Sequence, residues 1–218
     1  MARAGLLSER LSVAHGVWLT PDEGEILARH GVTVVHNPAS NLMLGSGRLA
    51  LPRMLEQAVP LALGTDSSNS GGRHDLFEVM RLALMLPRPD TTDPHEWPEA
   101  RQILEMATTG GARAIGHAGK LGRIEPGQRA DLVLLDPRGA ALAGAPVTVA
   151  HLVQHAGASA VAAVMINGSW ALRDGRIVAF NEAAVLDEVA AISAEVRATA
   201  GPELVVAETA APYFQACG

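Results

Sequence analysis

The fold is decided by residues 32–66, which read VTVVHNPASNLMLGSGRLALPRMLEQAVPLALGTD. The stretch opens with a β-branched run at 32–36 and closes with an apolar run at 60–66. Runs of this length and composition are typical of strands that are buried on both faces. Each run ends in a polar side chain, His36 in the first and Asp66 in the second.

The same pattern also occurs before this stretch. Residues 11–15 form another short apolar run that ends in His15. A helix is predicted at 21–30, because Thr20 just before it and Pro21 at its first position form a helix-start signal. Further helices are predicted at 51–57 and 75–86, and polar, glycine-rich loops at 37–47 and 67–72. Three buried strands that alternate with helices predict a parallel α/β architecture.

The three predicted strands carry their polar residues at the same end. The carboxyl ends of parallel strands meet at one edge of a sheet or barrel, where active sites are assembled. A single histidine at a strand end is more often a structural residue than a catalytic one. Because three successive strands end in side chains that can bind a metal or a proton, we predict a site that contains His15, His36 and Asp66.

The second half of the chain has a different character. It begins with a linker at 87–98 and a helix at 99–115, followed by a strand at 130–136, hairpin turns at Asn167-Gly168 and Asp174-Gly175, and a helix at 181–197. No structure is predicted after residue 201. We therefore predict three parts, at 1–118, 119–180 and 181–218.

Composition excludes several classes of protein. The net charge of −6, the pI near 5.7 and the absence of any basic run argue against a nucleic-acid partner. The single Cys217 excludes an internal disulfide and a cysteine-based metal site. No segment has the pattern of a signal peptide or of a membrane span, so we expect a cytoplasmic protein that does not interact with a membrane.

Taken in order, these motifs resemble the carboxy-terminal half of the amidohydrolase superfamily. Three motifs look like strands six, seven and eight of the family's barrel: AHGV at 14–17, VHNPASNLMLGSG at 35–47 and LGTD at 63–66. A fourth motif, GKLGRIEPGQRADLVLLD at 119–136, looks like the stretch in which the family's chains return to a second domain. The likeness is strongest to the ATZ/TRZ-like branch, which includes methylthioadenosine and adenosylhomocysteine deaminases, guanine-type deaminases and triazine chlorohydrolases. It implies an α/β fold with a partial (β/α)8 TIM-type barrel, a β-sandwich-like segment and a closing helix.

The resemblance also implies an activity and roles for five residues. The activity is hydrolysis of a C–N or C–Cl bond on a small nitrogen heterocycle by a hydroxide that a divalent metal activates, most often zinc, with iron as the other candidate. Asp66 resembles the carboxylate that binds the metal and takes the proton from its water. His15 resembles the histidine that hydrogen-bonds the attacking hydroxide or the leaving group. His36, Ser67 and Ser70 match positions at the substrate pocket.

The sequence departs from the family in its other metal ligands. The family's His-x-His pair of strand one and the histidine of strand five, three residues before a catalytic glutamate, do not occur here. Because Asp66 alone cannot hold zinc, we expect a truncated or split copy that works beside a missing amino-terminal half or as a homo-oligomer. His151 and His155 have the spacing of two ligands on one helix face, but no glutamate follows His151, and packing is the favoured role.

Two other interpretations stay open at this point. In the first, the chain is a catalytically inert remnant or a partner subunit of an amidohydrolase, with a structural or interaction role. In the second, it is an α/β module that binds a small molecule without a metal, and the loops at 45–47 and 67–72 cradle an anion. Neither loop matches a P-loop or a dinucleotide fingerprint.

Overall fold

A computed structural model describes residues 2–139, 141–144, 146 and 148–201. The chain divides into two compact units, Met1–Trp170 and Ala171–Gly218, and each is described by itself. The predicted division at 1–118, 119–180 and 181–218 stays a prediction. Among the described residues, no helix is long and apolar enough to cross a membrane.

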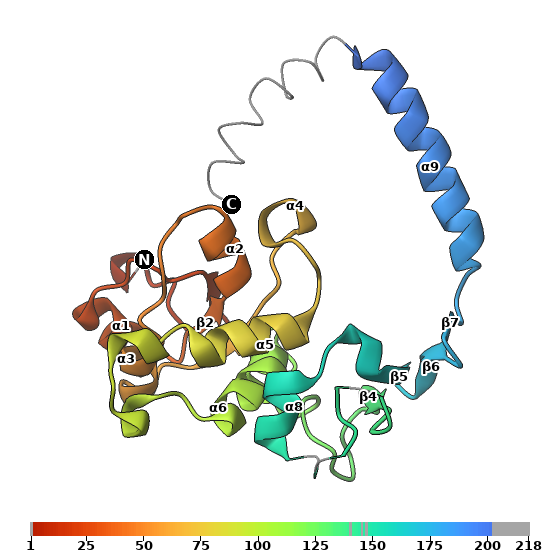
Figure 1. The fold of residues 1–218 in the computed structure, drawn as a ribbon. Coiled ribbons are helices and arrows are strands. Elements are labelled where there is room, and N and C mark those ends of the chain that lie inside the picture. Colours follow the sequence, from red (N-terminus) through yellow and green to blue (C-terminus); the bar gives the residue numbers. More distant parts are fainter. Residues whose placement is uncertain (1, 140, 145, 147, 202–218) are drawn as a thin grey trace. The chain divides into compact units, whose positions relative to one another are not determined.

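The first unit contains the predicted parallel sheet (Figure 1). Its strands are β1 (Ser12–Ala14), β2 (Thr33–His36) and β3 (Leu61–Leu63), in the order β1-β2-β3. Both pairs are parallel, with Val13 opposite Val34 and Val34 opposite Leu61. The three strands are confirmed. β1 ends at Ala14, because His15 has a positive φ and cannot continue a strand. β3 ends at Leu63, three residues before Asp66, which also has a positive φ.

Helices connect and follow these strands. They are α1 (Pro21–Arg29), α2 (Pro38–Met43), α3 (Leu51–Glu56), α4 (Ser68–Gly71), α5 (Leu76–Met85), α6 (Ala100–Glu105), α7 (Gly111–Ala114) and α8 (Val149–His155). Short 3-10 turns lie at Ala2–Ala4, Arg88–Asp90, Pro94–Glu96 and Ala158–Ala160. The start of α1 is as predicted: Thr20 forms a capping box with Glu23, and Pro21 is the first helical residue.

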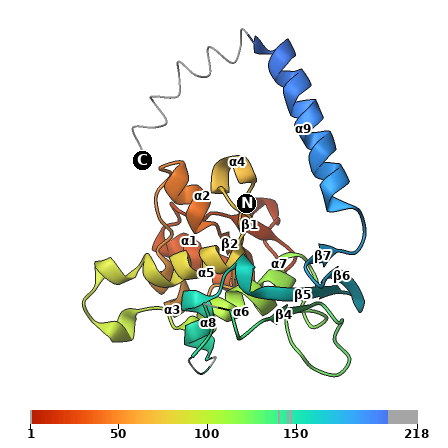
Figure 2. The same ribbon diagram turned by 45° about the vertical axis from the view of Figure 1, so that its right-hand side comes forward.

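Two segments that we predicted as loops contain short helices. The segment 37–47 contains α2, in which Pro38 supplies a backbone angle suited to the first helical position. The segment 67–72 contains α4, in which the amides of Ser70 and Gly71 donate to the carbonyl of Ser67. The loop predictions were wrong because Ser, Asn and Gly favour turns locally, whereas α2 and α4 pack against each other in the folded protein (Figures 1 and 2).

The helix predicted at 99–115 is interrupted. A π-helical turn, η4 (Met106–Gly110), separates α6 from α7. At Gly110 the helix lies directly on the sheet, and a Cβ atom there would collide with the carbonyl oxygen of Leu61. Only glycine allows this approach, and the wider turn lets the helix continue past the contact.

The core is built from aliphatic side chains, in a sequence of which aromatic residues make up only 3%. Buried members of the main cluster come from β2 and the residue before it, and from α3, α5 and α6: Val32, Val34, Leu51, Met54, Val79, Leu84 and Ile103. This core supports the sheet and therefore fixes the position of the strand ends.

A second sheet follows with the order β4-β5-β6-β7. Its strands are β4 (Leu132–Leu135), β5 (Val161–Ile166), β6 (Ser169–Arg173) and β7 (Arg176–Ile177). β4 and β5 are antiparallel, and both residues of the Asn167-Gly168 turn have a positive φ, as a tight hairpin requires. The strand and hairpin predictions are confirmed; the sandwich, which needs a second layer, stays a prediction.

The unit that begins at Ala171 contains one long helix, α9 (Glu182–Thr199). Asn181 is its N-cap, and its side-chain oxygen accepts from the amide of Ala184 at 3.4 Å. The predicted unstructured tail begins at the margin of the described residues, and all of it from residue 202 onward lies outside them.

Candidate active site

The two predicted catalytic residues lie after the carboxyl ends of β1 and β3: His15 is the first residue after β1, and Asp66 is the third residue after β3. His15 has φ of 68° and Asp66 has φ of 58°, which is the left-handed region that non-glycine residues rarely occupy. Such a conformation costs about 1–3 kcal/mol and is found most often at functional sites. The His15 amide still donates to the carbonyl of Val35 at 2.8 Å, so the backbone leaves the sheet only at this residue.

Two consecutive residues of α2 hold these side chains. The hydroxyl of Ser40 donates to Oδ2 of Asp66 at 2.6 Å. Oδ1 of Asn41 lies 2.8 Å from Nδ1 of His15. Ser40 and Asn41 are both buried, whereas their partners are partly exposed. One helix thus ties together two strand ends that are 51 residues apart in sequence.

These contacts bring His15 and Asp66 together, as predicted. Nε2 of His15 lies 3.7 Å from Oδ2 of Asp66, and the two side chains are 42% and 28% exposed. Both line a cavity of about 410 Å³, together with side chains of the loop after β1, of α2, of the loop after α2, and of α4: Val17, Trp18, Asn41, Leu44, Ser46 and Ser70. A pair of proton-accepting side chains therefore faces an open cavity of the size that small ligands occupy.

The two predicted substrate-binding serines differ in position. Ser70 lines the cavity, whereas Ser67 does not. The Ser67 hydroxyl bonds to Oδ1 of Asn69 at 2.6 Å and to the Ser70 hydroxyl at 2.7 Å, and its amide donates to Oδ1 of Asp66 at 2.8 Å. Ser67 therefore contacts Asp66 through its backbone. The substrate role of both serines stays a prediction.

His36 ends β2 between the two catalytic residues but is buried below them. It is 2% exposed and is absent from the cavity lining. Burial lowers its pKa to about 4, and the nearby His15 adds to that shift. His36 is therefore neutral at neutral pH. Its role in substrate binding stays a prediction. A substrate in the cavity could contact His36 only through a path to the buried ring.

The electrostatics of Asp66 favour its ionised form. The hydrogen bond from Ser40 and, after it, the backbone amide of Ser67 hold the pKa of Asp66 below its usual range. The carboxylate is therefore charged at neutral pH, which suits a group that binds a cation or receives a proton from bound water.

We expect Ser40→Ala to raise the pKa of Asp66 toward that of a free aspartate, because the largest cause of its depression is removed. Ser40→Thr, which keeps the hydroxyl, should leave the pKa low. The titration of the Asp66 carboxyl carbon, followed by NMR, measures both. An unchanged titration in Ser40→Ala would contradict the assignment of this hydrogen bond.

Sequence reasoning missed Ser40, Asn41 and Trp18. Ser40 and Asn41 stand in a segment that we predicted as a loop, and their partners lie 26 residues away in opposite directions along the chain. The one signal was a pair of polar residues placed before the apolar residues 42–44, two positions after a proline. Trp18 lines the cavity although its side chain is largely exposed, and nothing in its sequence context marked it.

The described residues do not form a metal site by themselves. No group of three or more His, Cys, Asp or Glu side chains within them is placed to hold an ion. Zinc normally takes three or four protein ligands, so Asp66, with His15 beside it, provides only part of a coordination shell. On α8, the ring centroids of His151 and His155 lie 4.7 Å apart. This helix lies at the opposite end of the unit from α2 and α4 (Figures 1 and 2).

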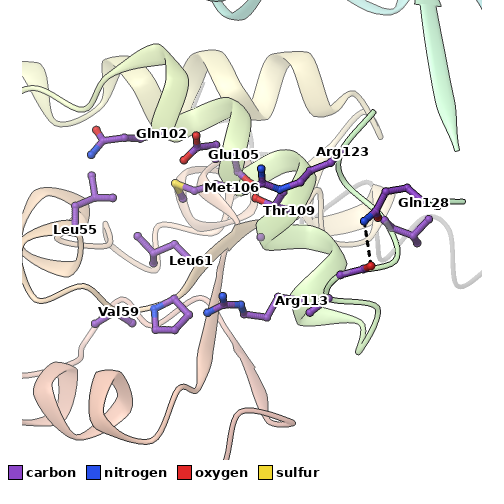
Figure 3. A pocket seen from close by; sticks show the side chains of 15 residues that line it. Leu55, Val59, Leu61, Gln102, Glu105, Met106, Thr109, Arg113, Arg123 and Gln128 are labelled. Atoms are coloured by element: carbon purple, nitrogen blue, oxygen red, sulfur yellow. Dashed lines mark hydrogen bonds between the residues drawn. The ribbon is translucent and has the colours of Figure 1, made fainter. Parts of the chain in front are cut away.

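A further cavity of about 480 Å³ lies at the other end of β3 (Figure 3). Residues that precede β3 or belong to it, including Val59 and Leu61, line it together with Met106, Arg113 and Gln128. None of the five predicted site residues is among its lining. The cavity at Asp66 is therefore the candidate active site.

Comparison with known proteins agrees with this geometry. Residues 1–171 match the model of the amidohydrolase family. A 5-methylthioadenosine/S-adenosylhomocysteine deaminase of Halobacterium salinarum is 40% identical over 200 residues, which is 92% of this chain and 46% of the relative. A 5'-deoxyadenosine deaminase of Methanosarcina mazei is 37% identical over 84% of this chain and 42% of its own length.

Solved structures give the same result. An adenosine deaminase from Xanthomonas campestris with bound zinc superposes with a TM-score of 0.85 at 33% identity, covering 90% of this chain and 45% of the other. An atrazine chlorohydrolase from Arthrobacter aurescens, complexed with zinc and atraton, superposes with a TM-score of 0.81 at 27% identity, over 87% of this chain and 42% of the other.

Two conclusions follow from these comparisons. The chain spans less than half the length of the relatives and structures that it matches. The family predicted from the motifs around His15 and Asp66 is confirmed, since its model covers most of the chain, from residue 1 to residue 171. The chain belongs to the amidohydrolase family.

Proposed function

We propose that this chain forms part of an active site for hydrolytic deamination of an amino group on a nitrogen heterocycle. The observation that carries the proposal is the pair His15 and Asp66, which face one cavity from two strand ends. Relatives named as deaminases of adenosine derivatives support this reaction over an inert remnant. The corresponding strands are proposed to be strands six to eight of the family's barrel.

The chemistry assigned to the two side chains is simple. Water adds to the ring carbon that carries the amine, and Asp66 accepts one proton from that water and passes it to the leaving nitrogen, so that ammonia departs. The second proton of the water ends on the neighbouring ring nitrogen, so that a carbonyl group remains. His15 forms a hydrogen bond with the attacking oxygen and holds it toward the ring. Asp66 is suited to the first task because it is ionised before the water arrives.

The cavity also supports the choice of substrate class. Trp18 and Leu44 provide apolar surface, and Ser46, Asn41 and Ser70 provide polar groups. A flat heterocycle fits such a lining, because its faces can stack on the indole while its ring nitrogens hydrogen-bond. We propose an aminopurine nucleoside derivative as the substrate, with aminotriazines as the alternative ring.

A divalent metal, zinc in preference to iron, is proposed to complete the site, with Asp66 as one ligand. When bound, it would lower the pKa of its water to about 7 and supply hydroxide at neutral pH. Zinc in two of the superposed structures supports this choice. The other ligands are proposed to come from outside the described residues, from a segment equivalent to the part of the relatives that this chain does not match.

The metal content of the purified chain provides one prediction. Because the described residues offer fewer than three ligands in one place, we expect well under one zinc per chain after dialysis. Elemental analysis by mass spectrometry measures this ratio. One tightly held zinc per chain would show that the chain completes the coordination shell alone and would overturn the proposed division of ligands.

The reaction itself is tested in a completed protein. We define it as this chain joined to the segment of the Halobacterium salinarum deaminase that the chain does not match. Ammonia release from adenosine, 5'-methylthioadenosine and an aminotriazine would be measured with zinc present. Release from a purine nucleoside supports the proposal, release from the triazine alone selects the alternative ring, and release from none overturns it.

A further inference from the structure

Asn41 makes a contact in the site that a residue used only for packing would not need. It is 2% exposed, its Oδ1 lies 2.8 Å from Nδ1 of His15, and its Nδ2 has no hydrogen-bond partner among the described residues. An unpartnered buried amide group is a cost to the folded state. Because a smaller apolar residue would avoid that cost, the amide is best explained by what its oxygen does to His15.

A neutral imidazole carries its proton on one nitrogen only. An amide oxygen can only accept a hydrogen bond, so the nitrogen that faces it must carry the proton. Oδ1 of Asn41 therefore requires a proton on Nδ1 of His15 and leaves Nε2 with a free lone pair. The hydrogen bond on one ring nitrogen sets the role of the other.

We infer that Asn41 is a positioning residue that fixes the tautomer of His15, so that the neutral ring presents Nε2 to the cavity as a hydrogen-bond acceptor. The inference deepens the proposed function, because it assigns a direction to the hydrogen bond between His15 and the attacking oxygen. His15 accepts a hydrogen bond from the water rather than donating one to it.

The distance to Asp66 agrees with this direction. Nε2 of His15 and Oδ2 of Asp66 lie 3.7 Å apart, beyond hydrogen-bond range, and both side chains are partly exposed to the cavity. Two acceptors that face each other across such a gap fit a donor between them. A water molecule has two protons, so it can donate one to each acceptor, and its oxygen lone pair then points away from both, toward the ring to be attacked.

The ring of His15 can be tested directly in the full chain, without any catalytic activity. The ¹⁵N shifts of its two ring nitrogens, recorded at a pH at which the ring is neutral and assigned by comparison with His15→Gln, identify the tautomer. We expect a protonated Nδ1 and an unprotonated Nε2. A protonated Nε2 in the unmodified protein would overturn the inference.

Three variants make the test specific to Asn41. Asn41→Ala should shift the ring to mainly Nε2–H, the tautomer that free histidine favours. Asn41→Asp keeps an oxygen and loses the NH₂ group, so the proton should remain on Nδ1. Asn69→Ala removes an exposed amide that contacts Ser67 instead, and it should leave the His15 signals unchanged.

Each outcome bears on the inference. If Asn41→Ala folds with the proton still on Nδ1, Asn41 does not set the tautomer. If Asn41→Asp carries the proton on Nε2, an oxygen at this position does not hold the proton on Nδ1, and the inference fails. If Asn41→Ala does not fold, the tautomers measured in the unmodified protein and in Asn41→Asp still decide whether the inference holds. Because the ring is observed without substrate, failure here is distinct from a completed protein that releases no ammonia.

Discussion

Replacing Asp66 by Asn is expected to lower kcat of the completed protein by about 10³-fold, within the range seen for loss of a proton-transfer group. The amide cannot accept the proton of the attacking water, and it is a weaker ligand for a divalent cation. Its shape is nearly unchanged, and the Ser40 hydroxyl can still donate to the remaining oxygen. The fold should therefore survive, as unchanged circular dichroism and thermal unfolding would show.

Comparison with neighbouring variants makes the result specific. His15→Ala should also abolish measurable turnover, because it removes the second acceptor at the cavity. Asp75→Asn, which changes a carboxylate that caps α5 and does not line the cavity, is the matched control and should retain kcat. A fully active Asp66→Asn enzyme would rule out Asp66 as the proton acceptor.

The second large effect concerns His36. Its protonation is expected to lower the free energy of unfolding at mildly acidic pH. Burial lowers the pKa of His36 from 6.5 to about 4, so the folded state disfavours its charged form. The unfolded chain binds a proton near pH 6.5, whereas the folded chain does so only near pH 4. The stabilisation that depends on neutral His36 is therefore complete above pH 6.5 and is lost as the pH falls to 4.

The full loss is about 3 kcal/mol, since each pKa unit corresponds to about 1.4 kcal/mol. Urea unfolding at pH 7.0 and at pH 4.5 measures most of it. His36→Leu, which cannot be protonated, should lose about 2–3 kcal/mol less between these two pH values than the unmodified chain. His30→Gln, at an exposed histidine after α1, is the control. An equal loss in His36→Leu would refute the role of His36.

Much of the fold could be predicted because its signals are local. The strands at 12–14, 33–36 and 61–63 follow from short apolar runs, and the start of α1 follows from Thr20 and Pro21. The turn at Asn167-Gly168 needs residues that tolerate a positive φ, and this dipeptide is well suited to it. Each of these features is determined by residues that are neighbours in sequence.

The features that were missed depend on contacts between distant residues. The π-helical turn ends at Gly110, which lies on the carbonyl of Leu61, and no local pattern near residue 110 reveals that contact. Likewise, Ser40 meets Asp66 only because α2 lies beside the end of β3. The strand ends of the site were therefore predictable, whereas the residues that orient them were not.

The burial of His36 has a similar explanation. Its place at the end of a strand suggested a position at the pocket, like those of His15 and Asp66. β2 is the central strand, and His36 is still in regular strand conformation, whereas the other two residues have left the sheet with a positive φ. The difference in backbone conformation separates a side chain that faces the cavity from one that lies beneath it.

The central claim is that this chain contributes Asp66 and His15 to a hydrolytic deaminase site, and ammonia release by the completed protein tests it most directly. With zinc present, we predict release of one ammonia per 5'-methylthioadenosine consumed, and none from the protein in which both residues are replaced by alanine. Equal release by that double variant, or no release by a completed protein that folds and binds zinc, would contradict the account.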